Sequence, residues 1–321
     1  MAEKQMNTQE TTAVSISVVI PFFNEEESLK PLCDVLLEQL NKLDRPYEII
    51  FVDDGSTDRS AEVLLNVRES ADNIKLIQFQ TNYGKSAALS VGFEHAQGQY
   101  IITMDADLQD DPREIPRLLD KLEEGYDIVS GWKKERNDPW SKRIPSKIFN
   151  YVTSLVSGLK LHDHNCGLKV YRREVTRSVS IYGELHRYIP ALAYYHGFKS
   201  AEIPVKHHPR RFGKTKYGLW RFFSGFFDLL TVILLTRFTR SPLHLFGIAG
   251  MVFFVAGFCI NAYLTYIKYA HNVGIGNRPL LFLGVLLIII GFQFFSLGFL
   301  GELIANIKQQ NRNYLIKNIH E

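Results

Sequence analysis

The sequence has few cysteines, almost no net charge and no apolar segment at its N-terminus. Its three cysteines, Cys33, Cys166 and Cys259, are widely separated in a chain of 321 residues, which argues against a disulfide framework or a paired-cysteine zinc site. Thirty-seven basic residues against 34 acidic ones leave a net charge of +3, too little for a protein that coats nucleic acid. Residues 1–14 are expected to be a disordered tail, and the domain after them to stay in the cytosol.

Charge is also missing from two long stretches near the C-terminus. No Asp, Glu, Lys or Arg occurs in the 27 residues between Arg240 and Lys268, or in the 23 between Arg278 and Glu302. About 20 apolar residues are enough to cross the hydrocarbon core of a bilayer. The sequence therefore predicts a transmembrane hairpin over residues 241–304, with spans at about 241–267 and 279–303.

The segments on either side of this hairpin complete the predicted membrane part. Residues 218–240 are apolar but carry Arg221 and Asp228 at helical spacing, which favours an amphipathic helix in the membrane interface over a buried core helix. Residues 305–321 are expected to form a cytosolic tail. Basic residues flank the outer ends of the hairpin, so the positive-inside rule places both termini in the cytosol.

Residues 15–217 alternate strand-like and helix-like segments, which predicts an α/β domain with a mainly parallel sheet. We expect strands at 15–21, 48–52, 74–79, 100–104, 127–130 and 167–171, and helices at 25–40, 85–96, 112–124 and 183–196.

Polar residues follow three of the predicted strands. Asp105, Asp107 and Gln109 come directly after the strand at 100–104, the pair Asp53-Asp54 ends the strand at 48–52, and the run from Pro21 to Glu25 ends the first strand. Ligands of open α/β sheets bind beyond such carboxyl ends. Two carboxylates and an amide oxygen can hold Mg²⁺ or Mn²⁺ together with diphosphate oxygens. On its own, the D-x-D pattern also fits a solvated turn that caps a helix.

Four blocks taken together are more specific. VVIPFFNEEESL, FVDDGSTDRS, NYGKSAALSVGFEHAQG and ITMDADLQDDP, in this order, resemble the family 2 glycosyltransferases with the GT-A fold. More narrowly they resemble the polyprenyl-phosphate group, which includes dolichyl-phosphate mannose synthase and bactoprenol glucosyltransferase. The resemblance implies a Rossmann-like GT-A domain of the α/β class, joined to an interfacial helix and two transmembrane helices.

The resemblance also assigns roles to residues on the donor side. It implies nucleotide binding, a donor loop, a diphosphate and metal motif, and a basic loop that closes over the phosphates. Mg²⁺ or Mn²⁺ would be held by Asp105, Asp107 and Gln109. The implied donor-binding residues are Pro21, Phe22, Glu25, Asp53, Asp54, Asn82, Gly84, Lys85, Asp105, Ala106, Asp107, Arg211, Lys214 and Lys216.

On the acceptor side the resemblance is carried by a basic cluster and a short acidic block. The implied acceptor-phosphate residues are Lys133, Lys142, Arg143, Ser146 and His186. A solvated basic face, or one that meets anionic lipid, is the alternative for this cluster. Asp163 is expected to face the acceptor, with Glu184 and His186 as alternatives, and an ordinary helix cap or core-edge histidine is equally open for each.

The expected chemistry needs little base catalysis. A monoalkyl phosphate has a second pKa of about 6, so its oxygen is already anionic at neutral pH. Positioning and charge stabilisation should dominate. We therefore predict Asp163, Asp107 and Lys214 as catalytic residues, and the resemblance implies a single displacement with inversion.

The sequence thus predicts transfer of a hexose-type sugar to undecaprenyl or another polyprenyl phosphate at the cytosolic membrane face. A UDP-glucose-like donor is favoured and GDP-mannose is left open. The expected partners are a nucleotide sugar, the polyprenyl lipid and the membrane, without nucleic acid, and a homo-oligomer is left open. A processive polysaccharide synthase would need a Q-x-x-R-W motif, which this chain lacks. A transferase with a soluble or protein acceptor and a non-catalytic membrane scaffold are the alternatives.

Overall fold

The computed structural model describes residues 14–134, 150–209 and 242–310, apart from Val156, Val273 and Asn277. The chain divides into two compact units, Met1–Val232 and Ile233–Glu321, which are described separately. The predicted N-terminal tail up to residue 13, the interfacial helix at 218–240 and the last eleven residues of the predicted cytosolic tail lie outside the described residues.

The first unit is built on a seven-stranded sheet with the order β3-β2-β1-β4-β6-β5-β7. β6 runs antiparallel to both of its neighbours, and the remaining pairs are parallel. The mainly parallel α/β sheet predicted from the sequence is therefore confirmed. The strands are β1 (Ile16–Phe22), β2 (Tyr47–Asp53), β3 (Ile74–Gln78), β4 (Tyr100–Thr103), β5 (Ile128–Trp132), β6 (Lys169–Arg172) and β7 (Ser200–Pro204).

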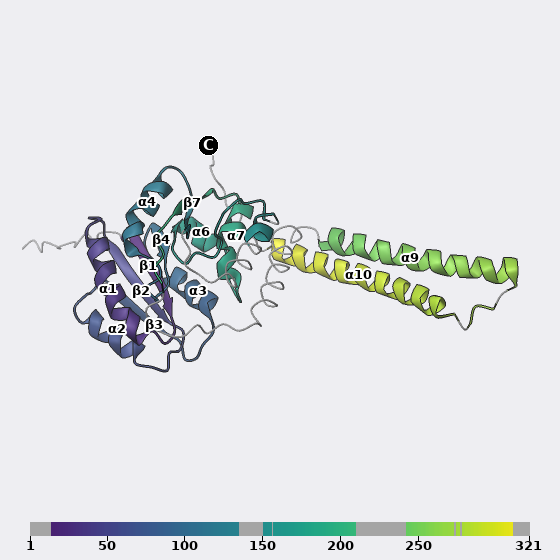
Figure 1. Cartoon of the computed structure of the whole chain (residues 1–321), viewed down its shortest axis with the longest axis horizontal. Helices are drawn as coiled ribbons and strands as arrows, with labels where there is room; N and C mark the ends of the chain where they lie inside the picture. Colours follow the sequence, from purple (N-terminus) through teal and green to yellow (C-terminus); the bar gives the residue numbers. More distant parts are fainter. Residues whose placement is uncertain are drawn as a thin grey trace, which may run out of the picture. The chain divides into compact units, whose positions relative to one another are not determined.

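Helices cover both faces of this sheet, with α1 and α2 on one face and α3 on the other (Figure 1). The alternating side chains of β1 explain the two layers, because Ile16, Val18 and Ile20 pack in one core cluster with the leucines of α1. Val19 points to the other face, where it packs against Gly92 of α3. A Cβ added to Gly92 would lie only 2.3 Å from Val19 Cγ1, so this contact requires glycine. The helices are α1 (Glu26–Asn41), α2 (Ser60–Arg68), α3 (Lys85–His95), α4 (Ile115–Glu123), α6 (Arg173–Ser178) and α7 (Ile189–Tyr195), with 3₁₀ helices η1 (Pro112–Glu114) and η2 (Leu185–Tyr188).

Several features of this unit differ from the sequence-based expectation. The helix expected at 183–196 is split into η2 and α7, because Pro190 lies in the first turn of α7 and cannot donate a hydrogen bond within a continuous helix. α6 and β7 were not predicted, and α2 has no counterpart among the expected helix ranges. α6 has only six residues, and β7 is a half-exposed strand of five residues whose alternation offers only Ala201 and Ile203 as apolar positions, which is too short for a clear signal.

The strand register places the predicted ligand-binding residues side by side. Phe22 at the end of β1 is paired with Asp53 at the end of β2, and Val19 is paired with Thr103 at the end of β4. The Asp54 N–H donates to the Phe22 carbonyl at 2.9 Å. The polar segments that follow β1, β2 and β4 therefore meet at one edge of the sheet.

A buried polar cluster stabilises the opposite edge. Glu48 of β2 is 3% exposed and accepts hydrogen bonds from the Ser17 hydroxyl at 2.5 Å and from the Gln97 N–H at 2.6 Å. Its second oxygen pairs with Lys75 of β3 at 2.7 Å. Burial raises the pKa of Glu48, but the Lys75 ion pair and the two hydrogen bonds outweigh it and lower that pKa below its usual value.

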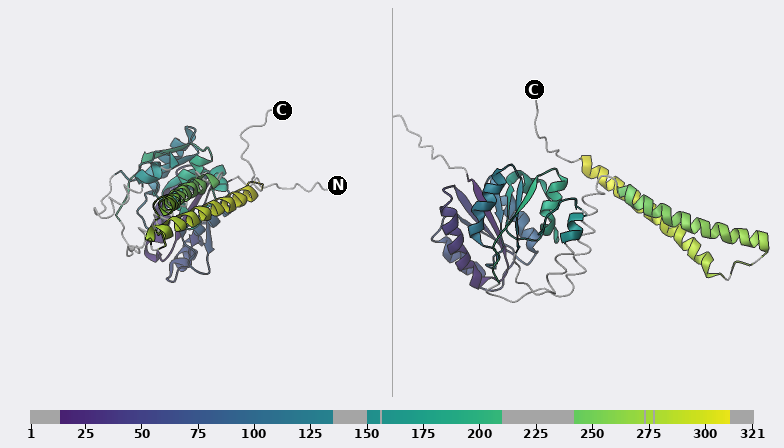
Figure 2. Two further views of the ribbon diagram at one scale, coloured as in Figure 1. Left: turned by 90° about the vertical axis from the view of Figure 1, so that its right-hand side faces the viewer. Right: turned by 45° about the horizontal axis from the view of Figure 1, so that its top comes forward.

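The second unit contains two long apolar helices, α9 (Pro242–His271) and α10 (Pro279–Gln310), which lie side by side in both figures of the whole chain (Figures 1 and 2). Both are long and apolar enough to cross a membrane. Glycine residues allow the backbones of α9 and α10 to approach each other closely. A Cβ on Gly257 would lie 2.6 Å from the Gly284 carbonyl oxygen. α10 continues as a helix to Gln310, into the segment for which the sequence predicted a tail.

We expect Glu48→Gln to lower the free energy of unfolding by about 1–3 kcal/mol at pH 7, because it removes a buried, hydrogen-bonded charge next to Lys75. The pKa of Glu48 is lowered in the folded state, so its stabilising contribution is present above the unfolded pKa of about 4.3 and is lost as the pH falls through the folded value. Denaturation of the full chain in detergent between pH 7 and pH 3 should therefore show a shallower acid dependence in the variant.

The matched control is Glu62→Gln, which alters an exposed glutamate of α2. Equal acid dependence in Glu48→Gln and wild-type protein would contradict the role assigned to Glu48.

Candidate active site

The end of β2 organises the loop that leads into α3. Asp53 accepts the Ser56 N–H at 2.8 Å, and Asp54 accepts the N–H groups of Tyr83 and Gly84 at 2.7 and 3.0 Å. Burial raises the pKa of Asp54, against the effect of these backbone donors. Gly84 has φ +92° and directly precedes Lys85, the first residue of α3. Asp54 therefore fixes the loop that carries the predicted donor residues Asn82, Gly84 and Lys85, and Asp53 fixes the turn that follows β2.

The segment that follows β1 is hydrogen-bonded to the start of α2. Pro21 and Phe22 are buried in β1. The Glu25 N–H donates to the Ser60 hydroxyl at 2.8 Å, and the Glu25 carboxylate accepts from the Ser28 hydroxyl at 2.9 Å. Glu25 thus lies at the point where β1 leads into α1, next to the start of α2.

Asp105, Asp107 and Gln109 lie in a tight turn after β4. Leu108 has a left-handed backbone with φ 60°, and the Asp107 carboxylate accepts the Gln109 N–H at 3.2 Å. The Gln109 side-chain amide donates to the His208 carbonyl at 3.4 Å. Ala106, between the two aspartates, is 4% exposed, and its side chain offers no polar group.

This turn has the chemistry of a Mg²⁺ or Mn²⁺ site. Two carboxylates and an amide oxygen are hard oxygen ligands, which both ions prefer. Within the part of the chain that the structure describes, no group of three or more His, Cys, Asp or Glu side chains could hold a metal. A cation at this turn would therefore depend on oxygen atoms of a substrate as well. Lys85 forms an ion pair with Asp105 and would have to move away from that carboxylate.

Asp110 connects this turn to two other parts of the fold and was not predicted as a site residue. It is 3% exposed and accepts the Asp105 N–H at 3.4 Å. Lys133 Nζ lies 3.5 Å from its carboxylate, and His207 Nδ1 lies 3.8 Å from it. Burial raises the pKa of Asp110, but Lys133 and His207 outweigh burial and hold that pKa well below its usual range.

The same ion pair changes the interpretation of Lys133. The side chain is 14% exposed, and burial lowers its pKa, but the Asp110 carboxylate outweighs burial and raises that pKa above its usual value. In the structure the Lys133 ammonium group is therefore paired with a carboxylate of the protein. Its predicted role in binding the acceptor phosphate stays a prediction.

The segment containing Asp163 packs directly on the turn. Asp163 is 1% exposed and accepts the Asn165 N–H at 3.1 Å. Gly167 is required by close packing, because an added Cβ would lie 2.7 Å from both the Asp105 carboxyl carbon and an Asp110 oxygen. The Thr103 hydroxyl donates to the Gly167 carbonyl at 2.9 Å. The same segment holds His164, whose pKa burial lowers to about 4.

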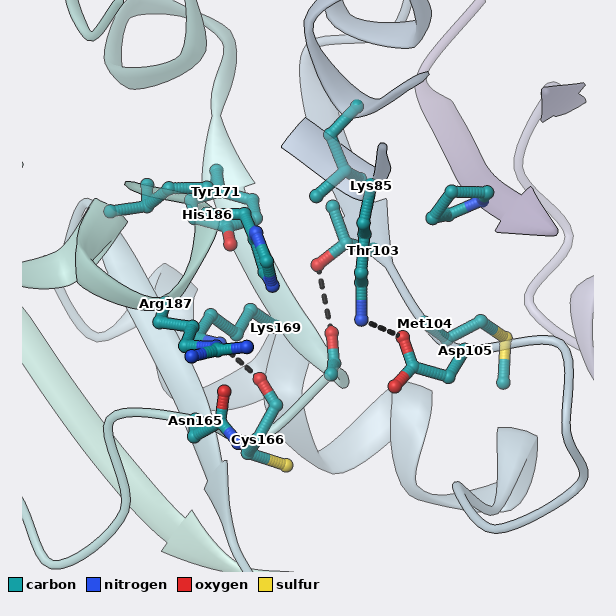
Figure 3. A pocket seen from close by; sticks show the side chains of 14 residues that line it. Lys85, Thr103, Met104, Asp105, Asn165, Cys166, Lys169, Tyr171, His186 and Arg187 are labelled. Carbon is teal, nitrogen blue, oxygen red and sulfur yellow. Dashed lines mark hydrogen bonds and ion pairs between the residues drawn. The ribbon is translucent and has the colours of Figure 1, made fainter. Parts of the chain in front are cut away.

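A pocket opens beside Asp105 between α3, β4, β6 and η2 (Figure 3). His186 lies in its wall and is hydrogen-bonded through Nδ1 to the Ser86 hydroxyl at 2.9 Å. Lys169 of β6 and Arg187 of η2 also line this pocket, and neither was predicted. A signal was present, because Lys169 interrupts the apolar strand sequence LKVY.

The structure thus gathers most of the predicted donor residues at one sheet edge and adds a pocket behind it. Glu184, the alternative acid, is ion-paired with Arg187. The other predicted residues, namely Lys142, Arg143, Ser146, Arg211, Lys214 and Lys216, lie outside the described residues.

The strand ends, the D-x-D turn and the mainly parallel sheet agree with one family. The profile described as "Glycosyl transferase family 2" matches residues 17–180. The chain belongs to glycosyl transferase family 2. The resemblance predicted from the four sequence blocks is confirmed.

Several relatives of this family member match along nearly their whole length. A dodecaprenyl-phosphate galacturonate synthase of Rhizobium johnstonii is 36% identical over 96% of this chain and 94% of its own. An undecaprenyl-phosphate 4-deoxy-4-formamido-L-arabinose transferase of Photorhabdus laumondii is 38% identical over 91% of this chain and 89% of its own. The fold is shared with glucosyl-3-phosphoglycerate synthase of Mycobacterium tuberculosis, at 19% identity and a TM-score of 0.51 over 69% of this chain and 79% of the other.

We expect Gly167→Ala to weaken the binding of UDP in the presence of Mn²⁺ by at least about tenfold, because the new Cβ displaces Asp105 from the turn. Calorimetric titration of the full chain in detergent measures this effect. Gly276→Ala, where an added Cβ meets nothing, is the control and should bind like the wild type. Unchanged UDP affinity in Gly167→Ala would show that the position of Asp105 does not matter for the donor.

Proposed function

We propose that this chain is an inverting glycosyltransferase that moves a sugar from a nucleoside-diphosphate donor to polyprenyl phosphate at the cytosolic face of a membrane. The observation that carries the proposal is the match over more than nine-tenths of the chain to two transferases whose names specify polyprenyl-phosphate products or substrates. The apolar helices α9 and α10 support it, because a polyprenyl acceptor keeps its chain in the bilayer.

The donor is proposed to bind along the edge where β1, β2 and β4 end. Pro21, Phe22, Asp53 and Asp54 would border the base and ribose, and the ordered loop at Asn82–Lys85 would approach the phosphates. The glucosyl-3-phosphoglycerate synthase of the same fold is described in complex with Mn²⁺ and UDP-glucose, which supports a UDP-sugar and a divalent metal here. GDP-mannose remains the alternative donor.

The D-x-D turn is proposed to hold the metal through Asp105, Asp107 and Gln109. When bound, Mg²⁺ or Mn²⁺ would stabilise the negative charge that develops on the departing nucleoside diphosphate. Lys85 would then leave Asp105 and donate hydrogen bonds to a diphosphate oxygen. Its ammonium group would thus have an anionic partner both without the donor and with it. Arg211, Lys214 and Lys216 are proposed to close over the same phosphates.

The acceptor phosphate is proposed to approach from the side of Asp163 and His186. Its oxygen is already anionic at neutral pH, so it can attack the anomeric carbon without a strong general base. Asp163, buried beside the turn, would stabilise positive charge at the sugar. Lys142, Arg143 and Ser146 are proposed to hold the acceptor phosphate with His186 and Lys133.

The membrane part is proposed to bring the active site to the lipid headgroups. Residues 218–240 would lie in the interface, and α9 and α10 would span the bilayer with both termini in the cytosol. A transferase for a soluble or protein acceptor would use the same segments only as an anchor. A non-catalytic scaffold would keep the nucleotide site but transfer nothing.

A donor panel on the detergent-purified full chain tests the proposal. With Mn²⁺ and undecaprenyl phosphate, mass spectrometry should detect a sugar-phosphate-lipid product that is absent without the lipid. Asp107→Asn should reduce the rate at least about a hundredfold, because it removes a carboxylate predicted to bind the metal. Asp120→Asn, an exposed position on α4, is the control.

Two outcomes would count against the proposal. Equal consumption of the nucleotide sugar with and without lipid would move the acceptor to a soluble molecule. Nucleotide binding without turnover of any donor would favour the scaffold.

A further inference from the structure

The pocket beside Asp105 has an excess of positive charge. Lys85, Lys169 and Arg187 all line it, and Figure 3 shows their side chains converging on the same space. Asp105 is the one carboxylate among the described lining residues, and it is already paired with Lys85. Arg187 is paired with Glu184, which lies outside the lining, so Lys169 is the cation that the described residues leave without a carboxylate at ion-pair distance.

Lys169 is the most deeply placed of these cations. It is 4% exposed, and its ammonium group donates to the Cys166 carbonyl. Among the described residues, no carboxylate lies within ion-pair distance of it, although Asp105 and Asp163 act on it from farther away. Burial lowers its pKa, as expected for an ammonium group without a close counter-ion. A buried charge of this kind is costly unless it is paired.

Arg187 adds a second unsatisfied donor from another element. Its side chain is 8% exposed, and its Nη2 atom pairs with Glu184. Its buried Nε–H has no hydrogen-bond partner among the described residues. Buried polar groups are nearly always satisfied, so an orphaned guanidinium N–H beside a buried ammonium indicates a missing anionic ligand.

We propose that Lys169 and Arg187 bind a carboxylate on the transferred sugar, so that the donor is a nucleotide-activated uronic acid. This inference rests on the proposed glycosyl transfer and names the class of sugar. A carboxylate has two oxygens, which can accept hydrogen bonds from the Lys169 ammonium and the Arg187 Nε–H together.

The position of the pocket favours the sugar over the acceptor phosphate as the source of this anion. Pro21, Thr103 and Met104 line it, and these residues lie at the carboxyl ends of β1 and β4, next to the turn proposed to hold the diphosphate. The sugar is attached to that diphosphate, so it reaches this space directly. Leu89 and Ile189 supply apolar surface for a sugar ring. The acceptor phosphate is proposed to reach the wall of this pocket at His186, which is half-buried, whereas Lys169 lies deeper at 4% exposed.

Matched donors provide the test. UDP-galacturonic acid differs from UDP-galactose, and UDP-glucuronic acid from UDP-glucose, only by a carboxylate in place of a hydroxymethyl group. Calorimetric titration of the full chain in detergent with Mn²⁺ should show at least one acid donor binding at least about tenfold tighter than its neutral partner. Lys169→Met and Arg187→Gln should each remove most of that preference and leave UDP affinity unchanged.

The control is Lys199→Met, which removes an exposed lysine outside the pocket and should keep the preference. Retained UDP affinity shows that a variant is folded, and the two test variants lie in different elements. Equal or weaker binding of both acid donors by wild-type protein would overturn the inference. So would a preference that survives in both variants, or variants that change only the KM for undecaprenyl phosphate, which would assign the anion to the acceptor.

The proposed function fails separately from this inference. Tight, carboxylate-dependent donor binding without transfer of any sugar to undecaprenyl phosphate would contradict the transfer reaction and still support the acid-sugar pocket.

Discussion

The buried carboxylate of Asp110 is the constraint on which the arrangement of this site depends. It binds the backbone of Asp105 and pairs with Lys133 after β5 and with His207 after β7. Three segments that are far apart in the sequence are thereby fixed around the D-x-D turn. A carboxylate that is almost fully buried is stable only when it is paired, so these segments are coupled energetically as well as in space. Gly167 completes the arrangement, because a larger residue would collide with both Asp105 and Asp110.

Charge balance links this arrangement to the proposed reaction. In the structure Lys85 neutralises Asp105, and Lys133 neutralises Asp110. A divalent metal at the turn would bring in two positive charges and the diphosphate beside it at least two negative ones, and Lys85 lies close enough to Asp105 to exchange partners between them. The pocket behind the turn keeps Lys169 without a close carboxylate among the described residues, and it keeps the Nε–H of Arg187 without a hydrogen-bond partner there, although Arg187 is paired with Glu184. This charge distribution supports the proposal that the substrate carries negative charge at more than one position.

The sequence was sufficient for the features that depend on local patterns. The apolar runs of β1, β2 and β4 end in Pro21, Asp53-Asp54 and Asp105, and in a parallel sheet such ends meet at one edge. The charge-free stretches likewise predicted α9 and α10. Features that depend on long-range packing could not be predicted in this way. No local pattern shows that Lys133 pairs with Asp110, or that Gly167 packs against two carboxylates. Short elements such as α6 and β7 have too few residues for a periodic signal.

The central claim is that the edge at β1, β2 and β4 binds a nucleoside diphosphate through a metal on the D-x-D turn. A crystal structure of the full chain with UDP and Mn²⁺, with anomalous scattering measured for manganese, tests it most directly. The account predicts a manganese peak between Asp105 and Asp107, with Lys85 moved from Asp105 to a phosphate oxygen. Nucleotide bound elsewhere, or bound here with the Lys85–Asp105 pair intact and manganese absent from the turn, would contradict it.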